Sequence, residues 1–143
     1  MPRTGSSKSG AASKVKSHTV HLKRAYDEPS PDDGSRILVD RLWPRGVPRD
    51  TLALDDWLKD IAPSDELRRW FGHDAARWQE FVQRYLAELE APPASDAVSA
   101  LEQKARKGNV TLVYAARDTA HNNAVVLRDM VTDRLARKHH AKN

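Results

Sequence analysis

The sequence predicts a single α/β domain whose small, mostly parallel sheet is packed by helices, with a disordered basic tail at the N-terminus. Three observations support this fold class. Short apolar runs typical of strands alternate with longer segments that carry helical periodicity. Near the C-terminus a strand leads directly into a helix, which is the connection that parallel sheets use. The chain has 143 residues, 39% of them hydrophobic, which is enough for one modest core.

The first part of the chain predicts two strands. Residues 18–26 alternate polar and apolar side chains, as a half-buried strand does, and residues 36–43 form a more apolar run. Asp, Pro, Ser and Gly fill the stretch 27–34 between them, which predicts a turn. After the second strand, we expect residues 51–62 to form a short helix that ends before Pro63.

The middle of the chain predicts two helices. Ser64 is a good N-cap for a helix over 65–71, and Gly72 can end that helix in the left-handed conformation. Asp74 can cap the next helix, which extends to residue 90 before two prolines. Its apolar residues fall on one continuous stripe, made of Trp78, Phe81, Val82, Tyr85, Leu86 and Leu89.

The last part of the chain predicts a helix, a strand and a final helix. Ser95 is a candidate N-cap for a helix that ends at Gly108, with basic residues in its last turn. Residues 109–118 are rich in β-branched and aromatic side chains and predict a strand. Asp118 or Thr119 is then expected to cap the C-terminal helix.

Several classes of function are excluded or disfavoured by composition. The chain has no cysteine, which excludes disulfides, thiolate zinc sites, iron–sulfur clusters and cysteine nucleophiles. It has no Walker loop, dinucleotide-binding glycine motif, HExxH or GxSxG. His139 and His140 lack a spaced partner, so we expect no metal and no cofactor. Without an apolar run long enough for a membrane span, we expect a cytoplasmic protein.

The positive charge is concentrated near the ends of the chain. Residues 1–24 and 134–143 carry ten Lys and Arg and no acid, whereas the residues between them hold 14 basic and 20 acidic side chains, a net charge of −6. We therefore expect a disordered basic tail over 1–17, a folded domain over 18–138 and a frayed basic C-terminus over 139–143. A basic nucleic-acid-binding face on the folded body is not expected.

Two polar segments carry the candidate functional residues. The first, DRLWPRG, spans residues 40–46, and the second, YAARDTAHNNAVV, spans residues 114–126. Each follows a predicted strand, and ligands of α/β sheets bind beyond the carboxyl ends of the strands. The segments can share one cleft if their strands are parallel neighbours. We assign acid–base roles to Asp40, Asp118 and His121, and ligand contacts to Arg41, Trp43, Arg45, Tyr114, Arg117 and Asn122.

Structural roles compete with these assignments. Asp118 is also an ordinary N-cap, and Trp43 is also suited to packing. Asp40 is equally suited to a structural pair with an arginine, and His121 to a hydrogen bond with the preceding loop. Three further tryptophans are assigned to the core, namely Trp57, Trp70 and Trp78.

Three stretches of the chain together resemble a known family. They are YDEPSPDDGSRILVDRLWPRG, DDWLKDIAPSDELRRWF and VTLVYAARDTAHNNAVVL, in this order. They resemble the signature blocks of the bacterial YeaO-like family, a branch of domain of unknown function 488, over residues 18–133. The resemblance implies a compact α/β protein and carries no established reaction.

The sequence leaves two functions open. In the first, the protein binds an anionic small molecule or nucleotide-like ligand in a polar cleft at the strand carboxyl ends, and the residues do not decide whether acid–base chemistry follows. In the alternative, it is a non-enzymatic binding or regulatory module whose basic tails contact nucleic acid or an acidic partner. The sequence does not determine the oligomeric state.

Overall fold

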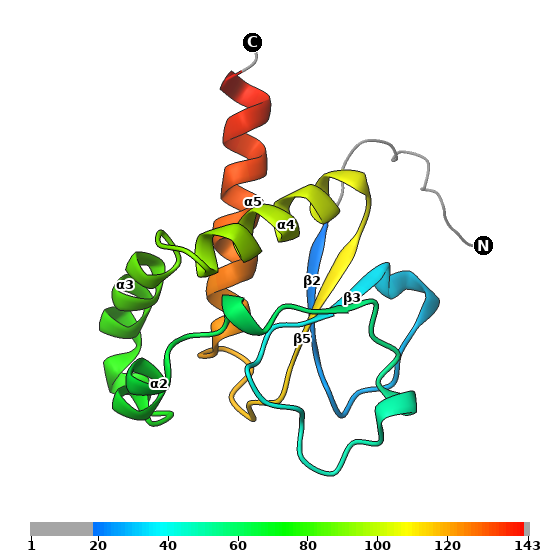
Figure 1. The fold of residues 1–143 in the computed structure, drawn as a ribbon, viewed down its shortest axis with the longest axis horizontal. Helices are drawn as coiled ribbons and strands as arrows, with labels where there is room; N and C mark the ends of the chain where they lie inside the picture. Colours follow the sequence, from blue (N-terminus) through cyan, green and yellow to red (C-terminus); the bar gives the residue numbers. More distant parts are fainter. Residues whose placement is uncertain (1–18, 142–143) are drawn as a thin grey trace, which may run out of the picture.

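A parallel sheet of four strands forms the centre of the computed structural model, which describes residues 19–141, with side chains up to residue 137 (Figure 1). Along the sheet the strands are β2 (Val20–Arg24), β5 (Val110–Tyr114), β3 (Ser35–Leu38) and β4 (Asp56–Trp57). Every neighbouring pair is parallel, which confirms the predicted fold class. The expected tail over 1–17 lies outside the described residues.

Strand β5 is the central strand, and all five of its residues are buried. Burial on both faces explains its continuous apolar sequence, which differs from the alternating pattern of β2. Alternate residues serve opposite faces of the sheet. Leu112 and Tyr114 pack with Ile37 in the main core, whereas Val113 packs with Leu38 in a smaller cluster.

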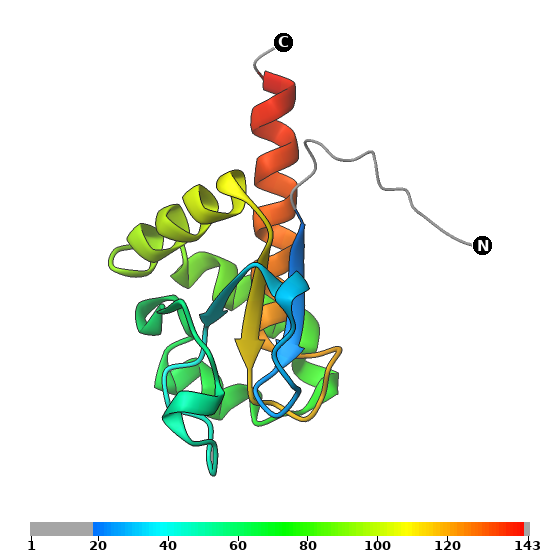
Figure 2. The ribbon, with the colours of Figure 1, turned by 90° about the vertical axis from the view of Figure 1, so that its right-hand side faces the viewer.

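Four helices supply the main core on one face of the sheet. They are α2 (Asp65–Phe71), α3 (Trp78–Glu88), α4 (Ala94–Lys107) and α5 (Asn123–Ala141). Helix α5 lies against β2 and β5, and α4 lies against α5 (Figure 2). The predicted stripe on α3 is used as expected, because Phe81, Tyr85 and Leu89 are buried in this core.

The helix boundaries show which local signals are used. Ser64 caps α2 by accepting the Leu67 N–H at 3.1 Å, and Gly72 ends it with a left-handed φ of 53°, both as predicted. Ser95 was expected to cap α4, which was wrong. The helix already begins at Ala94 without a side-chain cap. Helix α5 continues to Ala141, into the stretch where fraying was expected.

The segment over residues 39–58, which we call the tryptophan loop, covers the other face of the sheet. The prediction of a helix over residues 51–62, which overlap this loop, was wrong. This stretch contains β4, which lies between two short 3-10 turns, η3 (Arg49–Thr51) and η4 (Lys59–Ile61). Pairing with β3 outweighs the local helical pattern. The Leu58 N–H donates to the Leu38 carbonyl at 3.0 Å, and Trp57 packs in the smaller cluster.

Some of the basic residues near the chain ends form ion pairs and hydrogen bonds within the fold. Lys23 pairs with Asp33 at 3.0 Å, and Arg24 donates to the carbonyl oxygens of residues 115 and 116. Arg134 pairs with Glu102 at 3.0 Å across α4 and α5. These side chains are therefore structural. Among the residues that the structure describes, no helix has the length and apolar character needed to cross a membrane.

Candidate functional site

A cleft of about 750 Å³ lies at the carboxyl ends of β3 and β5. The strands run toward the end of the molecule that lies opposite the C-terminal part of helix α5 (Figure 2). Because β3 and β5 are parallel neighbours, the segments that follow them meet at this edge of the sheet. The cleft is lined by both predicted polar segments and by residues of the region 62–81 that includes α2.

Asp40 joins the ends of the two strands. Its carboxylate Oδ2 accepts the backbone N–H of Ala115 at 2.9 Å, and its backbone oxygen accepts the Trp57 Nε1–H at 2.7 Å. Burial raises the pKa of the Asp40 carboxyl, against the hydrogen bonds from Ala115 and the Asn123 side chain, which lower it. The alternative role considered for Asp40, a structural pair with an arginine, is not found among the described residues.

Asp118 shapes the turn that leads into α5. Its Oδ1 accepts the N–H groups of Ala120 at 2.9 Å and His121 at 3.1 Å, and its Oδ2 lies 2.9 Å from His121 Nδ1. The bonds from His121 and Ala120 hold the Asp118 pKa below its ordinary value. The prediction that Asp118 or Thr119 caps the last helix was wrong, because a complete turn separates them from α5.

Asn122 is the residue that caps α5. Its side-chain oxygen accepts the Val125 N–H at 3.1 Å, and its side-chain nitrogen donates to the Asp118 carbonyl at 2.8 Å. Asn122 also lines the cleft, but it is buried and both ends of its amide are already engaged. Asn122 therefore holds the turn, and its side-chain amide has little capacity left for a contact with a ligand.

His121 lies between the Asp118 carboxylate and an aromatic wall. Its ring meets the Trp78 ring edge to face, with centroids 5.1 Å apart, and its side chain is 34% exposed. When Nδ1 carries the proton donated to Asp118, Nε2 is left as an acceptor. This arrangement can orient the imidazole toward a ligand or take part in proton transfer.

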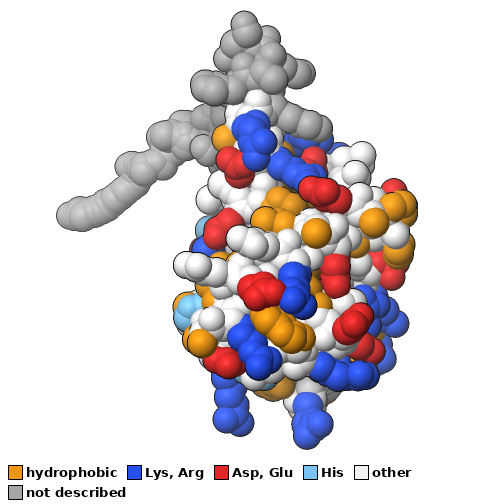
Figure 3. Space-filling view, turned by 90° about the vertical axis from the view of Figure 1, so that its left-hand side faces the viewer, with side chains coloured by type: hydrophobic (Ala, Val, Ile, Leu, Met, Phe, Trp, Pro, Cys, Tyr) orange, Lys and Arg blue, Asp and Glu red, His pale blue; other side chains and the backbone are white. Residues whose placement is uncertain are grey.

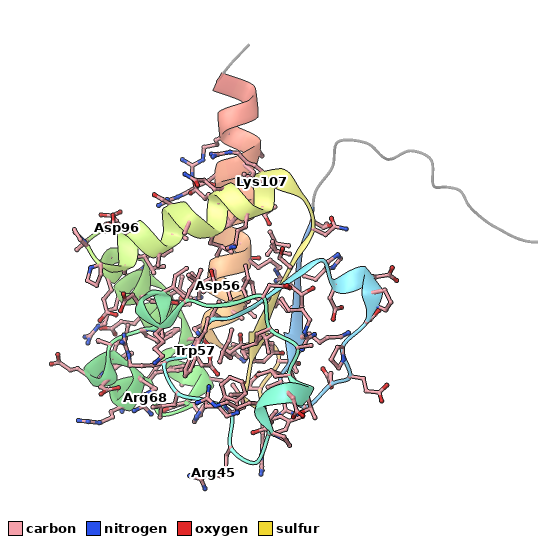
Figure 4. The ribbon with its side chains drawn as sticks, turned by 45° about the vertical axis from the view of Figure 1, so that its right-hand side comes forward. Arg45, Asp56, Trp57, Arg68, Asp96 and Lys107 are labelled. Atoms are coloured by element: carbon pink, nitrogen blue, oxygen red, sulfur yellow. The ribbon has the colours of Figure 1, made fainter. Side chains whose placement is uncertain are left out.

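Four arginines line the cleft, and two of them have side chains without an internal partner. Arg41 donates to the Ala62 carbonyl at 3.3 Å, and Arg68 pairs with Asp65 at 3.4 Å. Arg45 and Arg117 are exposed, and their guanidinium groups make no hydrogen bond or ion pair with another described residue. Lys and Arg side chains project from this end of the molecule (Figure 3), and Arg45 and Arg68 both lie on its lower side (Figure 4).

Trp43 combines packing with a place at the cleft. Its ring meets Trp57 at a centroid distance of 5.6 Å, its Nε1–H donates to the Val47 carbonyl at 2.7 Å, and the Arg49 guanidinium lies 4.7 Å from its centroid. Trp43 packs against the smaller cluster and also lines the cleft. Both interpretations of this residue therefore have structural support.

Tyr114 does not line the cleft, although we expected it to contact a ligand. It is 3% exposed and packs in the main core, and burial raises the pKa of its hydroxyl. The strand alternation explains this position, because Tyr114 shares the helix-facing side with Leu112. We therefore leave Tyr114 out of the proposed site.

Several lining residues carry no local signal of a site. Phe71 and Phe81 stack at 4.4 Å and form an apolar wall, and Tyr26 reaches the loop by donating to the Arg45 carbonyl at 3.1 Å. Arg68 and His73 reach the cleft from the α2 region. Only the three-dimensional fold brings these residues to the strand ends. In the described part of the chain, no cluster of three or more His, Asp or Glu is arranged to hold a metal ion.

Comparisons with known proteins place the chain among uncharacterised relatives. Residues 19–143 match a family model described as "Inactive DUF488-N3 subclade". An uncharacterised protein of Mycobacterium tuberculosis is 40% identical over 120 residues, which cover 84% of this chain and 99% of the relative. The uncharacterised protein YeaO of Escherichia coli is 44% identical over 110 residues, which cover 77% and 94%. No solved structure gives a significant match.

Proposed function

Because the chain belongs to the DUF488 family, in its inactive N3 subclade, we propose that it binds an anionic small molecule or nucleotide-like ligand in this cleft without transforming it. The observation that carries the proposal is the pair of exposed guanidinium groups, Arg45 and Arg117, at a cleft of about 750 Å³. Guanidinium groups without internal partners are available for a phosphate or carboxylate, which they bind with paired donors.

The remaining walls of the cleft suit the organic part of such a ligand. Phe71, Phe81 and Pro63 provide apolar surface, and Leu42 is 69% exposed at the same cleft. Small-molecule sites commonly combine mostly apolar walls with a few directed polar groups. The arginines then account for the anionic group and the apolar walls for the rest of the ligand.

The experiment compares Arg117→Ala with the wild-type chain in titration calorimetry against inorganic phosphate and a set of nucleoside monophosphates. We expect the variant to bind about 10- to 100-fold more weakly, because it loses a charge-assisted contact of roughly 1.5 to 3 kcal/mol. Arg69→Ala is the matched control, since Arg69 is exposed on α2 and does not line the cleft. The proposal fails if no probe binds the wild type, or if the two variants bind equally well.

A second candidate function is acid–base chemistry in the same cleft, favoured by the 2.9 Å contact between His121 and Asp118. In this alternative, His121 with Asp118 or Asp40 transfers protons, and Arg41, Arg45 and Arg117 orient the substrate. Chromatography of a bound nucleotide after prolonged incubation separates the two functions. An unchanged nucleotide supports binding alone, and conversion that His121→Gln abolishes supports the enzyme.

A further inference from the structure

Two carboxylates line the cleft, and its anion-binding role requires neither of them. Asp118 already binds Ala120 and His121 in the turn before α5, which leaves Asp40. Asp40 lines the same cleft as Arg41, Arg45 and Arg117. Its side chain is half-buried, burial raises the pKa of its carboxyl group, and no described lysine or arginine forms an ion pair with it. A charge held in this way is unfavourable unless something compensates for it. Asp40 would also repel an anion that approached it directly.

The structural role of Asp40 does not need the negative charge. The carboxylate accepts a backbone N–H from Ala115 at 2.9 Å and lies beside the amide of Asn123, which itself donates to the Val39 carbonyl at 2.9 Å. Both partners are neutral donors, and a neutral oxygen can also accept the Ala115 N–H. A carboxylate has about four acceptor positions, so capacity remains for a further donor.

We propose that the ligand of this cleft is a nucleoside monophosphate whose base presents an exocyclic amino group to Asp40. This inference rests on the proposed function and names the class of its ligand. The phosphate is held by Arg45 and Arg117, and the faces of the base contact the apolar wall that includes Phe71. The carboxylate accepts the amino hydrogen, which is how acidic side chains recognise the amino group of cytosine.

The size and polarity of the cleft favour this class over a simple anion. A cavity of about 750 Å³ lies in the range of roughly 300 to 1,000 Å³ typical of sites for organic ligands, so a single phosphate would leave most of it unfilled. A base without the amino group would leave the remaining acceptor position of Asp40 without a donor from the ligand. Sites with an unmatched polar group discriminate strongly against the ligand that lacks the partner.

The test uses the full chain and three kinds of probe in titration calorimetry. The first kind is AMP and CMP, the second is their analogues that lack only the exocyclic amino group, and the third is ribose 5-phosphate. We expect AMP or CMP to bind at least tenfold more tightly than its own analogue. Asp40→Asn should reduce that preference, because a neutral amide oxygen accepts the amino hydrogen less strongly than a carboxylate does, while the affinity for ribose 5-phosphate stays the same. Asp50→Asn, at an exposed position of the same loop, is the matched control and should keep the preference.

The possible results separate the two proposals. If ribose 5-phosphate binds but the amino group brings no preference in the wild type, the inference is wrong and the proposed anion binding stands. If Asp40→Asn retains the preference undiminished, the inference is also wrong. If none of the probes binds, both proposals fail. Thermal denaturation checks the variant, and we expect its Tm to stay close to that of the wild type, because the amide oxygen of asparagine can still accept the Ala115 N–H. The wild-type comparison alone decides the inference if that variant does not fold.

Discussion

At the scale of single residues, Asp33 links two strands that are not neighbours. Its buried carboxylate contacts Lys23 of β2 at 3.0 Å and Arg36 of β3 at 2.7 Å, and it accepts the Ser30 N–H at 3.0 Å. Strand β5 lies between β2 and β3, so these two strands are linked through the Asp33 ion pairs and not by direct strand pairing. Arg36 is itself buried and also donates to the Leu52 carbonyl.

The Asp33 network predicts a loss of stability in acid. Burial by itself raises the Asp33 pKa, but the bonds from Ser30, Lys23 and Arg36 outweigh it and hold the pKa below 3.8. A lowered folded-state pKa contributes stability that is present above the unfolded value and lost as the pH falls through the folded value. We expect urea unfolding to show this loss below about pH 4. Asp33→Asn should weaken that acid dependence and cost about 3 to 5 kcal/mol at pH 7, because Arg36 stays buried without its partner.

Asp32→Asn provides the control for this measurement. Asp32 is the exposed neighbour, and its substitution should leave both the midpoint at pH 7 and the acid dependence close to those of the wild type. Equal midpoints for the two variants would show that the network adds no stability.

At the scale of elements, the tryptophan loop depends on two indole rings. Trp43 and Trp57 pack together on the face of the sheet opposite the helices, and each donates its indole N–H to a carbonyl of this loop. The loop also carries Asp40 and Arg45 to the cleft. The packing of the two indole rings against the sheet thus positions Asp40 and Arg45 at the cleft.

Trp43→Ala tests this coupling. We expect the substitution to lower the free energy of unfolding by about 3 kcal/mol in urea titration, because the indole ring no longer packs against the cluster that contains Leu38 and Leu52. Leu42→Ala is the control and should change it by less than about 0.5 kcal/mol, since Leu42 is 69% exposed. A Trp43 variant as stable as the control would assign Trp43 to ligand contact alone.

The comparison of predicted and observed elements shows which signals are local. Helix α2 was predictable because Ser64 and Gly72 act within a few residues of the helix ends. The strand β4 was not, because Trp57 gains its conformation from pairing with β3, which no local pattern encodes. Asp118 and Asn122 are both good capping residues, and only the packing of α5 selects between them.

The location of the candidate site was predictable from the sequence, but part of its lining was not. Both polar segments follow strands, so their meeting depended only on β3 and β5 being parallel neighbours, which the fold class favoured. The orientation of Tyr114 depended on which face the helices cover, and the sequence pattern of a strand buried on both faces contains no such information. Arg68 and Phe71 come from α2, which reaches the cleft only through the tertiary fold.

At the scale of the whole molecule, positive charge is divided between folded and terminal parts. Lys23, Arg24 and Arg134 are engaged within the fold, whereas Arg3, Lys8, Lys14 and Lys16 precede the described residues. The intervening residues 25–133 carry a net charge of −6. Any affinity for nucleic acid is therefore expected to come from the terminal charges.

Replacing those four basic residues of 1–18 by alanine in the full chain tests this expectation. The slope of log affinity against log salt for a random DNA duplex should become smaller by about 3 to 4, because that many fewer counterions are released. Alanine at Ser6, Ser7, Ser9 and Ser13 is the matched control and should leave the slope unchanged. An equal slope for both variants would locate the DNA contacts on the folded body.

The strand order also governs when the protein can fold during synthesis. Strand β5 inserts between β2 and β3, pairing Val110 with both Val20 and Ser35. A ribosome must therefore release residues up to Tyr114 before the sheet can close, and until then β2 and β3 have no partner between them. Contacts so distant in the sequence form slowly, because a long loop must close before they contribute any stability. The nascent chain thus leaves β2 without its partner strand, and β3 with only β4, for most of its synthesis, which makes this stage the one most open to chaperone binding and aggregation.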